Sequence, residues 1–418
     1  MNLLIKSAKI IDVHSKFHQK KCDILIENGK ITDIAATIAN LNSYKEVALK
    51  NLHVSAGWFD TSVSFGEPGY EERETIANGL NVAAKSGFTA VALNANTNPF
   101  IDNKSAVEFL VNKADKHAVA LYPIANLSQQ AKGAEMAELY DMSNSGAIAF
   151  GDYNSPITNA NLMKLALLYA QNFNGLVLSF PQNDAIANKG TANEGENSVL
   201  LGLKGNPTLA EELQIARDLF LLEYTGGKLH IPTITTANSV KLISEAKKKG
   251  LDITCSVSAH HLYLTDDALN EFNTNCKVTP PLRTKADTKA LIKGLKNGTI
   301  DMITSDHNPM DVEHKKVVFE NASDGTIGLE SLFGALNTKL ELEQLITYLT
   351  TNSRKRFGIE NPVIAIGETA NISLFDPEIE YNFNEEYILS TSKNSAFLDK
   401  PLKGKAYGIF SKNKLILN

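Results

Sequence analysis

The sequence is poor in cysteine, and this limits the kinds of protein that it can encode. Its 418 residues contain three cysteines, Cys22, Cys255 and Cys276, which lie far apart and follow no metal-binding spacing. Cys22 and Cys255 lie in apolar, strand-like stretches, where a cysteine is usually a buried free thiol. Because free thiols persist in reducing compartments, the cysteine content favours a cytoplasmic protein.

The sequence also lacks long apolar runs and clusters of basic residues. No run approaches the roughly 18–20 apolar residues that span a bilayer. The opening stretch, MNLLIKSAKIIDVHSKF, is interrupted early by Lys6 and has no small-residue cleavage site, so we expect no signal peptide. The net charge is −6, and no lysine or arginine cluster is interleaved with aromatic residues. We therefore expect a cytoplasmic protein that binds neither membranes nor nucleic acids.

Both ends of the chain show the residue pattern of short β-strands. NLLIKSAKII and CDILIENGKITDIA alternate apolar and polar residues, and Asn28-Gly29 is typical of a hairpin turn. ANISLFDP and KAYGIFSKNKLILN look similar near the C-terminus, with a reversal at residues 412–414. We predict one small β-sandwich domain assembled from residues 1–53 and 360–418.

Residues 54–359 alternate short apolar runs with helical patterns. The runs are HVSAGWFD, TAVALNAN, AVALYPIANL, GAIAFGDY, GLVLSFP, KLHIPTIT, DITCSVSA and DMITSD. Between them lie helical stretches such as NSVKLISEAKKKG, for which we expect an Asn238 cap and a Gly250 stop. Eight strands in this alternation predict an α/β protein with a (β/α)8 TIM barrel. A doubly wound open sheet is the alternative, but it usually has fewer strands and a glycine-rich first turn, which is absent here.

Functional groups of such a barrel project from the C-terminal ends of its strands. Polar residues follow most of the apolar runs. The stretches are Asp60–Gly69, Asn94–Thr97, Gly151–Asn154, Ser179–Gln182, Thr233–Thr236, Ala259–His261 and Ser305–Met310. These stretches are where we look for a site.

Several longer motifs resemble those of dihydroorotases of the amidohydrolase superfamily, the long bacterial type related to allantoinases and dihydropyrimidinases. The motifs are EPGYEERETIANGLNVAAKSGFTAVALNANTNP, NEGENSVLLGLKGNP, VSAHHLYLTDD, KVTPPLRTKADTKALIKGLKNGTIDMITSDHNP and GTIGLES. The resemblance covers almost the whole chain. It implies a role in pyrimidine biosynthesis, a zinc-dependent hydrolysis of a cyclic amide, and a β-sandwich built from both termini.

The residues that the resemblance implies for catalysis are largely replaced. In the family, the first strand is followed by Asp-x-His-x-His-x-Arg-x-Pro-Gly. The two metal-binding histidines correspond to Ser62 and Ser64, and the arginine corresponds to Gly66. The remaining family positions correspond to Asp152 or Tyr153 for the acidic ligand, Ser179 and Thr233 for two histidines, Thr279 for an asparagine and Met310 for a histidine. The matching residues are Asn96, implied to contact substrate, Asp306, implied to shuttle the proton, and Asp152.

These replacements predict the loss of the metal. Zinc lowers the pKa of bound water from ~15.7 to about 7, which supplies the attacking hydroxide. It is held by imidazoles, carboxylates or thiolates at fixed distances, and a serine or threonine hydroxyl is a short and weak donor. We therefore expect no metal, no other cofactor and a catalytically inactive protein. Oxygen ligands could hold Mg²⁺ or Ca²⁺, but of Asp60, Glu67, Asp152 and Asp306 we expect at most two to face the site.

The remaining polar residues have structural interpretations. Without a metal, we expect Asp306 to accept hydrogen bonds from loop amides or from His307, and Asn96 to tie a loop. His260 and His261 are neighbours, which point in opposite directions in a strand or loop, so we expect no metal pair. We expect His230 to be a core histidine. A serine nucleophile at Ser62, Ser64 or Ser179 would need a histidine base, and none occupies a neighbouring strand end except His307.

Three functional hypotheses remain open. In the first, which the resemblance suggests, the chain is a pseudoenzyme that serves as a structural or regulatory partner of aspartate transcarbamoylase, and it could also form a homodimer. In the second, the chain hydrolyses dihydroorotate to N-carbamoyl-aspartate or opens another cyclic amide, with zinc in an atypical site. In the third, a pocket between Ser62, Asn96, Ser179, Thr233 and Asp306 binds a small polar molecule.

Overall fold

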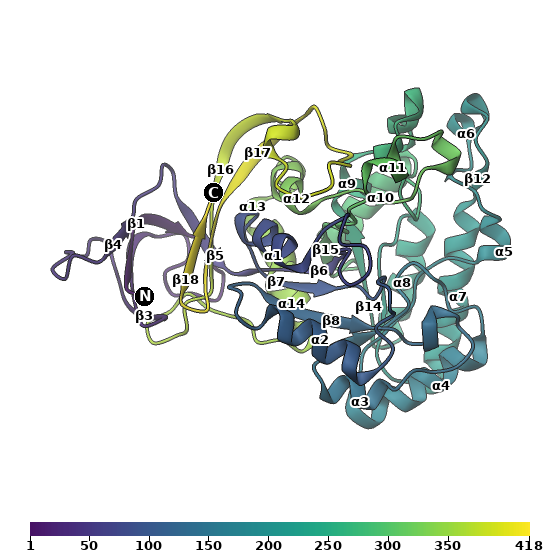
Figure 1. The fold of residues 1–418 in the computed structure, drawn as a ribbon, viewed down its shortest axis with the longest axis horizontal. Helices are drawn as coiled ribbons and strands as arrows, with labels where there is room; N and C mark the ends of the chain where they lie inside the picture. Colours follow the sequence, from purple (N-terminus) through teal and green to yellow (C-terminus); the bar gives the residue numbers. More distant parts are fainter.

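The computed structural model describes all 418 residues, which form two eight-stranded β-sheets, with helices around the second, and a small two-stranded sheet of β11 Ala192–Asn193 and β12 Gly205–Asn206. The first sheet combines both ends of the chain, on the left of Figure 1. Its strands run in the order β18-β17-β16-β5-β1-β2-β3, with β4 beside β1. Their bounds are β1 Leu3–Ile10, β2 Lys21–Glu27, β3 Lys30–Ala35, β4 Lys45–Val47, β5 His53–Ala56, β16 Ile372–Phe383, β17 Lys400–Ser411 and β18 Lys414–Leu417. This sheet forms the small β-sandwich domain.

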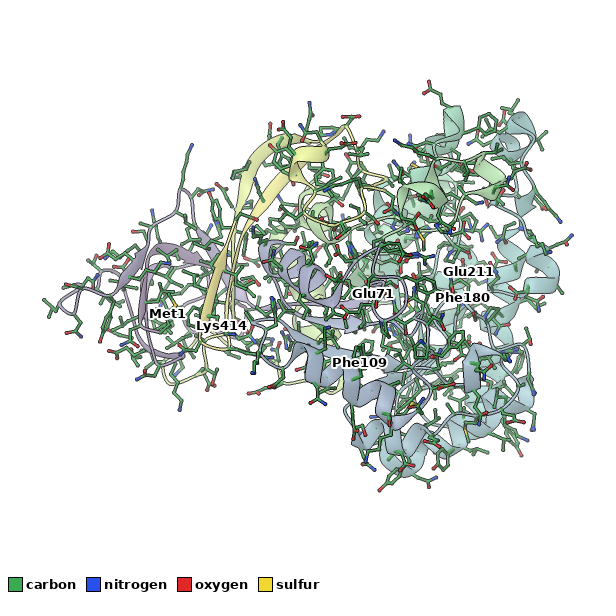
Figure 2. All side chains as sticks on the ribbon, in the orientation of Figure 1. Met1, Glu71, Phe109, Phe180, Glu211 and Lys414 are labelled. Carbon is green, nitrogen blue, oxygen red and sulfur yellow. The ribbon has the colours of Figure 1, made fainter.

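Tight turns and one terminal contact hold this sheet together. Asn28 and Gly29 have φ values of 51° and 80°, as a type I′ hairpin between β2 and β3 requires. Lys412 and Asn413 reverse the chain between β17 and β18 in the same left-handed region. Figure 2 labels Met1 and Lys414 in this domain, where the Met1 amine donates to Asn413 Oδ1 at 2.8 Å. Both hairpins lie where the sequence predicts them.

The second sheet is a closed barrel of eight parallel strands, in the order β15-β14-β13-β10-β9-β8-β7-β6. The strands are β6 Trp58–Val63, β7 Phe88–Leu93, β8 Ala120–Ala125, β9 Ala149–Phe150, β10 Val177–Leu178, β13 Leu229–Ile231, β14 Ile253–Ser258 and β15 Met302–Thr304. The last strand closes onto the first: Ser64 N donates to His307 O at 2.6 Å, and Val63 forms a parallel bridge with His307. The α/β fold class is thus confirmed as a TIM barrel.

Helices surround the barrel on the right of Figure 1. The principal ones are α1 Ile76–Lys85, α2 Lys104–Ala114, α4 Ala160–Ala170, α7 Thr208–Thr225, α8 Ala237–Lys248, α10 Lys285–Lys296, α12 Leu329–Leu336, α13 Leu342–Leu349 and α14 Thr351–Phe357. The expected Asn238 cap of α8 is wrong. Thr236 caps this helix by accepting from Ser239 N at 3.1 Å, while Asn238 bonds Glu212 instead. No helix in the structure is both long and apolar enough to cross a bilayer.

The run HVSAGWFD is predicted as one strand but forms parts of two. Residues 53–56 are β5 of the terminal sheet, and β6 of the barrel begins at Trp58. Gly57 joins them at a point of very close packing. A Cβ there would lie 1.9 Å from Asn371 Oδ1 and 2.1 Å from Thr89 Oγ1. The two sheets therefore meet at a glycine because no side chain fits between them.

The interior of the barrel is filled by side chains. Phe59, Ala90, Ala92, Ile124, Ala149, Leu176, Leu178, Met302 and Phe357 form one buried cluster. Large and small side chains alternate around it, so the barrel is a packed core and not a pore. All three cysteines are buried free thiols. A site within the barrel must therefore lie above this cluster, at the C-terminal ends of the strands.

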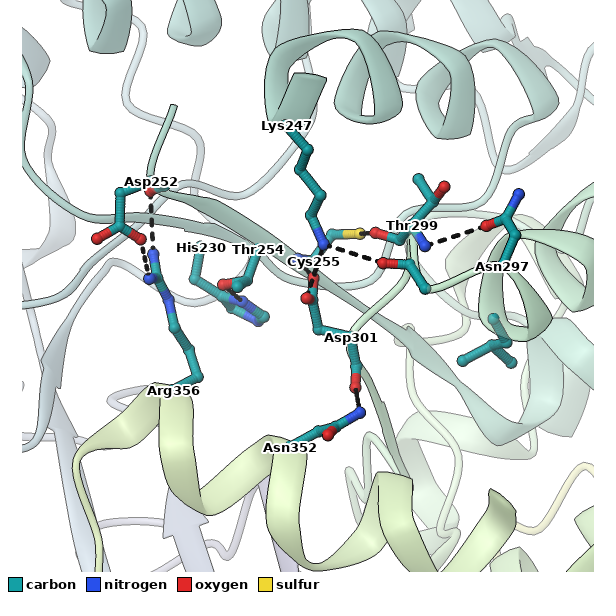
Figure 3. A network of polar contacts seen from close by, with 12 residues as sticks. His230, Lys247, Asp252, Thr254, Cys255, Asn297, Thr299, Asp301, Asn352 and Arg356 are labelled. Atoms are coloured by element: carbon teal, nitrogen blue, oxygen red, sulfur yellow. Dashed lines mark hydrogen bonds and ion pairs between the residues drawn. The ribbon is translucent and has the colours of Figure 1, made fainter. Parts of the chain in front are cut away.

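A polar network closes the opposite, N-terminal side of the barrel (Figure 3). Lys247, in the last turn of α8, pairs with Asp301 at 2.6 Å, and Asp301 also accepts from Cys255 N at 2.9 Å. Arg356 of α14 pairs with Asp252 and donates to Leu229 O at 2.7 Å. Lys247 therefore makes a specific ion pair, and its charge also complements the C-terminus of α8.

Candidate functional site

The C-terminal end of the barrel contains a cavity of about 30 Å³. A volume of this kind has room for a water molecule or two. Its wall includes residues from most strand ends. The polar ones are Thr61, Ser62, Asn94, Asp152, Tyr153, Asn154, His230, Thr233, Ser256, Thr279 and Asp306. The cavity is thus polar but nearly filled by its own walls.

Ser62, Asn94 and Asp306 of this wall form one hydrogen-bonded cluster, which Ser64 joins from outside the cavity. Ser62 Oγ donates to Asp306 Oδ1 at 3.1 Å. Asn94 Nδ2 donates to Ser62 Oγ at 3.1 Å and to Ser64 Oγ at 3.2 Å. The two serines stand where the family resemblance implies metal-binding histidines, and here the Asn94 amide joins them. The cluster therefore satisfies its own polar groups.

Asp306 is buried and faces no cation. Burial raises the pKa of its carboxyl group to about 7, the Ser62 hydrogen bond opposes that rise, and the charge of Asp60 adds to it. The expected bonds from loop amides or His307 are not present. His307 turns its ring away, and its Nδ1 lies 3.2 Å from Gly328 N and 3.4 Å from Leu329 N. Asp306 therefore faces the cavity, where a proton on it is readily exchanged at neutral pH.

Tyr153 occupies the wall beside Asp306. Burial raises the pKa of its phenol well above the usual value, and the nearby Asp306 charge raises it further. The phenol is therefore neutral, in a place where the resemblance implies an acidic ligand. The adjacent Asp152 is committed elsewhere: its carboxylate accepts from Leu127 N at 2.8 Å, from Ser128 N at 3.1 Å and from the Ser128 hydroxyl. Asp152 thus joins the ends of β8 and β9.

The expected position of Ser179 is wrong by one residue. Ser179 Oγ donates to Asp218 Oδ2 of α7 at 2.6 Å, outside the barrel. Phe180, labelled in Figure 2, lines the cavity instead. Side chains of a strand alternate between its two faces, and Leu176 and Leu178 belong to the barrel core. Continuing that alternation by two residues places Phe180 on the inner face. The sequence pattern alone therefore could have predicted Phe180 in place of Ser179.

Asn96 is likewise outside the cavity. Its Oδ1 is buried without a hydrogen-bond partner, and Asn94 takes the place in the wall. Ala90 and Ala92 are core residues of β7, so the same alternation predicts Asn94. Of the five residues of the sequence-predicted pocket, the structure brings Ser62, Thr233 and Asp306 together and leaves Asn96 and Ser179 outside.

The histidines of this region make hydrogen bonds and ring contacts within the fold. His260 and His261 lie in the short helix α9 Ala259–Tyr263, and their ring centroids are 4.5 Å apart, so the expectation that they point in opposite directions is wrong. His261 Nδ1 lies 2.6 Å from Ser258 Oγ, and its Nε2 lies 3.0 Å from Pro280 O. His230 contacts Thr254 Oγ1 at 2.9 Å and Ser256 Oγ at 3.3 Å in the cavity floor. His230 is thus a satisfied core histidine, as expected.

Two further family positions cannot perform their implied roles. Gly66 replaces an arginine, and a Cβ there would lie 1.7 Å from Tyr70 O, so this backbone admits no side chain. Met310 is buried and is not part of the cavity wall. Thr233 and Thr279 do reach the wall, as the resemblance implies for these positions.

The donor set does not fit a metal ion. No group of three or more histidine, cysteine, aspartate or glutamate side chains is close enough to hold one. Asp60 accepts from the Thr304 hydroxyl and from Ser305 N at 3.0 Å, and so fixes the ends of β6 and β15. Glu67 accepts from Ile76 N at 2.8 Å and pairs with Lys113 at 2.7 Å. Of the four carboxylates that the sequence offers for a hard cation, Asp60, Glu67 and Asp152 are therefore used in other contacts, and Asp306 alone is left facing the cavity with its single Ser62 bond.

The backbone of the cavity keeps an unusual conformation. Tyr153, Thr233 and Asp306 all have positive φ, at 52°, 55° and 48°. Such values cost about 1–3 kcal/mol each for residues other than glycine, and they cluster at functional sites. The cavity therefore combines three strained backbone positions with side chains that include no group of three metal-ligating residues.

Comparisons with known proteins agree with this architecture. Residues 53–239 match a family model described as Dihydro-orotase-like. The chain is 39% identical over 404 residues to a dihydroorotase of Ruminiclostridium cellulolyticum, which covers 95% of this chain and 94% of that protein. It is 35% identical over 422 residues to a dihydroorotase of Citrifermentans bemidjiense, which covers 100% and 99%.

Solved structures with the same fold include hydantoinases. L-Hydantoinase (dihydropyrimidinase) from Arthrobacter aurescens superposes with a TM-score of 0.87 at 20% identity, over 100% of this chain and 96% of that chain. A D-hydantoinase gives a TM-score of 0.84 at 22% identity, over 100% and 95%. These two structures bear on the fold alone. The sequence relatives decide the family, and the chain belongs to the dihydroorotase family.

Proposed function

We propose that this chain is a dihydroorotase-like protein of pyrimidine biosynthesis that has lost hydrolase activity and serves as a structural or regulatory partner of aspartate transcarbamoylase. One observation carries the first half of the proposal. The cavity at the strand ends is lined by Ser62, Tyr153, Phe180 and Thr233, Ser64 is bonded to Asn94 behind this wall, and no group of three metal-ligating side chains is present. On this account it is a divergent copy of the family without the metal-binding histidines.

The chemistry of the reaction explains why these side chains do not support it. An amide carbonyl is attacked by hydroxide, which is scarce at neutral pH unless a metal lowers the pKa of bound water from ~15.7 to about 7. Asp306 can accept or return a proton near neutral pH, but it cannot by itself generate hydroxide. Ser62 is a poor nucleophile because its hydroxyl faces a carboxylate and no histidine base. The chain therefore keeps a proton shuttle without a nucleophile.

The size of the cavity supports the same proposal. Ligand sites usually measure about 300–1,000 Å³, whereas this cavity measures about 30 Å³. Tyr153 and Phe180 are the large side chains in its wall. A substrate could enter only if these rings moved, and Gly66 offers no side chain to bind its carboxylate.

The second half of the proposal requires a surface for a protein partner. Apolar side chains are exposed on the neighbouring helices α4 and α7, including Leu168 at 43%, Phe220 at 74% and Tyr224 at 80%. Large exposed apolar side chains on adjacent elements are typical of interaction surfaces. We name aspartate transcarbamoylase as the partner because the chain resembles dihydroorotase homologues that associate with it.

Two measurements test this proposal. Purified protein supplied with zinc should show no hydrolysis of dihydroorotate above the buffer rate, whereas an active dihydroorotase of the family serves as positive control. Affinity purification from native lysate should recover aspartate transcarbamoylase, and the double change Phe220→Ser and Tyr224→Ser should reduce that recovery. Turnover in the first assay, or repeated absence of the transcarbamoylase in the second, contradicts the corresponding half.

A second candidate function is an active cyclic amide hydrolase with an atypical zinc site. The observation that favours it is Asp306, whose pKa of about 7 suits proton transfer at neutral pH. This candidate requires about one equivalent of bound zinc and an activity that Asp306→Ala abolishes. A metal-free preparation that stays inactive after zinc addition rejects it.

A further inference from the structure

Helix α7, on the outer side of the barrel in Figure 1, has polar side chains buried and large apolar side chains exposed. Its buried side includes Glu211, Gln214 and Asp218. Its outer side carries an apolar stripe, which consists of Leu209, Leu213, Ala216, Phe220 and Tyr224. A surface helix normally directs its large apolar side chains to the core. Packing within one chain therefore does not explain the stripe.

Hydrogen bonds of the buried side fix the orientation of α7. Glu211 Oε1 accepts from Thr235 N at 2.8 Å and from Thr236 N at 3.1 Å. Asp218 Oδ2 accepts from Ser179 Oγ at 2.6 Å. A rotation that buried the stripe would break these bonds and separate both carboxylates from their donors, which is costly. The apolar stripe is therefore held on the outside.

The stripe has the spacing of a helix that packs along another helix. Its residues recur at steps of four, three, four and four, close to the 3.5-residue period of paired helices. It extends over roughly 22 Å of helix. The neighbouring helix α4 adds three partly exposed apolar side chains, Leu165, Leu168 and Tyr169. We call the stripe and these three side chains the α4/α7 face.

A groove lies beside the stripe, between α7 and α8. It measures about 180 Å³, and its apolar lining includes Leu219, Leu242 and Ala246. Cavities of about 150 Å³ admit a benzene ring. Phe220 and Tyr224, the most exposed side chains of the stripe, lie next to this groove. The same surface therefore offers both a projecting ring and a groove that suits one, as a two-fold dimer requires.

The exposed apolar area is that of a stable dimer. Phe220 and Tyr224 expose roughly 300 Å² together, since an aromatic side chain measures about 150–250 Å². The leucines and Tyr169 raise the apolar area to roughly 500 Å². A standard interface buries about 800 Å² on each partner, and somewhat more than half of that area is non-polar.

The charges of α7 near Phe220 do not oppose this contact. Arg217 pairs with Asp218 at 2.6 Å, and Glu223 pairs with Lys249 of the following turn at 3.0 Å. Because these charges are already paired within the chain, two copies can meet here without bringing unpaired like charges together.

We propose that a second copy of this chain covers the α4/α7 face in a two-fold dimer. An aromatic ring of each copy enters the groove between α7 and α8 of the other. This dimer is independent of the proposed function, but one consequence rests on that function. The transcarbamoylase contact uses the same side chains, so binding of a second copy and binding of the transcarbamoylase exclude each other.

Sedimentation equilibrium of the full-length protein at micromolar concentration tests the dimer. The wild type should have twice the mass of the chain. Phe220→Ser with Tyr224→Ser should raise the dissociation constant at least about 100-fold, because a few buried aromatic side chains dominate most interfaces. Val312→Ser with Val318→Ser removes two exposed side chains of the segment after β15 and should change it by less than about threefold. All four positions are exposed, so urea unfolding should show both variants as stable as the wild type. A monomeric wild type, or equal weakening by the two variants, overturns the proposal.

Photocrosslinking identifies the face that the dimer uses. Phe220→benzoylphenylalanine should crosslink one copy to the α7–α8 groove of the other, at residues such as Leu242 and Ala246. Mixing isotope-labelled and unlabelled protein separates crosslinks between copies from those within one copy. Crosslinks to another part of the second copy, or none between copies, would show that a different surface forms the dimer and would overturn the proposal.

Addition of purified aspartate transcarbamoylase tests the competition. The dimer should dissociate as the complex forms, measured by sedimentation velocity. A transcarbamoylase that binds the intact dimer refutes the competition. Failure of the transcarbamoylase to bind at all contradicts the second half of the proposed function and the competition with it, while the dimer is decided by the first two experiments alone.

Discussion

Replacing Asp306 by asparagine should stabilise the protein, and should do so increasingly as the pH rises. The carboxyl group has its ordinary pKa of 3.8 in the unfolded chain and a pKa of about 7 in the folded protein. Between these values the folded protein binds one more proton than the unfolded chain. The free energy of unfolding therefore falls by about 1.4 kcal/mol per pH unit, or roughly 4 kcal/mol in total above pH 7.

An asparagine side chain cannot ionise, so the Asp306→Asn variant is exempt from this loss, while its side-chain oxygen can still accept from Ser62. We expect a small stability difference between Asp306→Asn and the wild type near pH 4. Above pH 7, the variant should be more stable by up to roughly 4 kcal/mol, less the cost of an unpaired amide, which is about 1–3 kcal/mol.

Urea unfolding between pH 4 and pH 8 measures this difference. The single tryptophan, Trp58, is buried in the first strand of the same barrel and reports its unfolding by fluorescence. Glu386→Gln, which removes an exposed carboxylate, controls for net charge. A stability difference that does not change with pH would show that Asp306 is not held in a buried, cation-free environment.

Three further predictions concern the barrel. Phe180→Ala should lower stability by about 3 kcal/mol in urea unfolding, since it removes a buried ring, and the enlarged cavity should bind benzene in a calorimetric titration. Ser179→Ala should leave the cavity unchanged and cost about 1–2 kcal/mol through the lost Asp218 bond. Gly57→Ala should cost about 1–3 kcal/mol in thermal or urea unfolding, because its Cβ would overlap Asn371 and Thr89; an unchanged stability would contradict the close packing of the two sheets. A variant with zinc ligands restored at the strand ends should bind zinc, measured by metal analysis after dialysis; its changes are Ser62→His, Ser64→His, Tyr153→Asp, Phe180→His and Thr233→His. The same variant with Ser179→His in place of Phe180→His should bind zinc less well, because Ser179 lies outside the barrel. Equal zinc binding by the two variants would contradict the strand register found here.

Much of the fold follows from local patterns. Alternation of apolar residues predicts the terminal strands, and Asn28-Gly29 predicts their turn, because both depend on contacts between near neighbours. The barrel follows from eight apolar runs separated by helical patterns. The division of HVSAGWFD between two sheets could not be predicted, since Gly57 is required by contacts with Thr89 and Asn371, which are distant in the sequence.

The side chains of the candidate site were harder to predict from the sequence than the fold. A shift of one residue along a strand exchanges its inner and outer faces, and this is how Ser179 was expected where Phe180 lies. Alternation carried on from Leu178, or from Ala92 to Asn94, would have corrected both positions. His260 and His261 were expected in extended chain, where neighbours diverge, but a short helix brings their rings together.

Equilibrium dialysis of the purified protein against zinc, followed by metal analysis, tests the central claim most directly. The structure leads us to expect far less than one equivalent of retained zinc, with no difference between the wild type and Asp306→Ala. Retention of one equivalent in the wild type, lost in Asp306→Ala, would contradict the account, since it would place a metal among side chains that offer no ligand set for it.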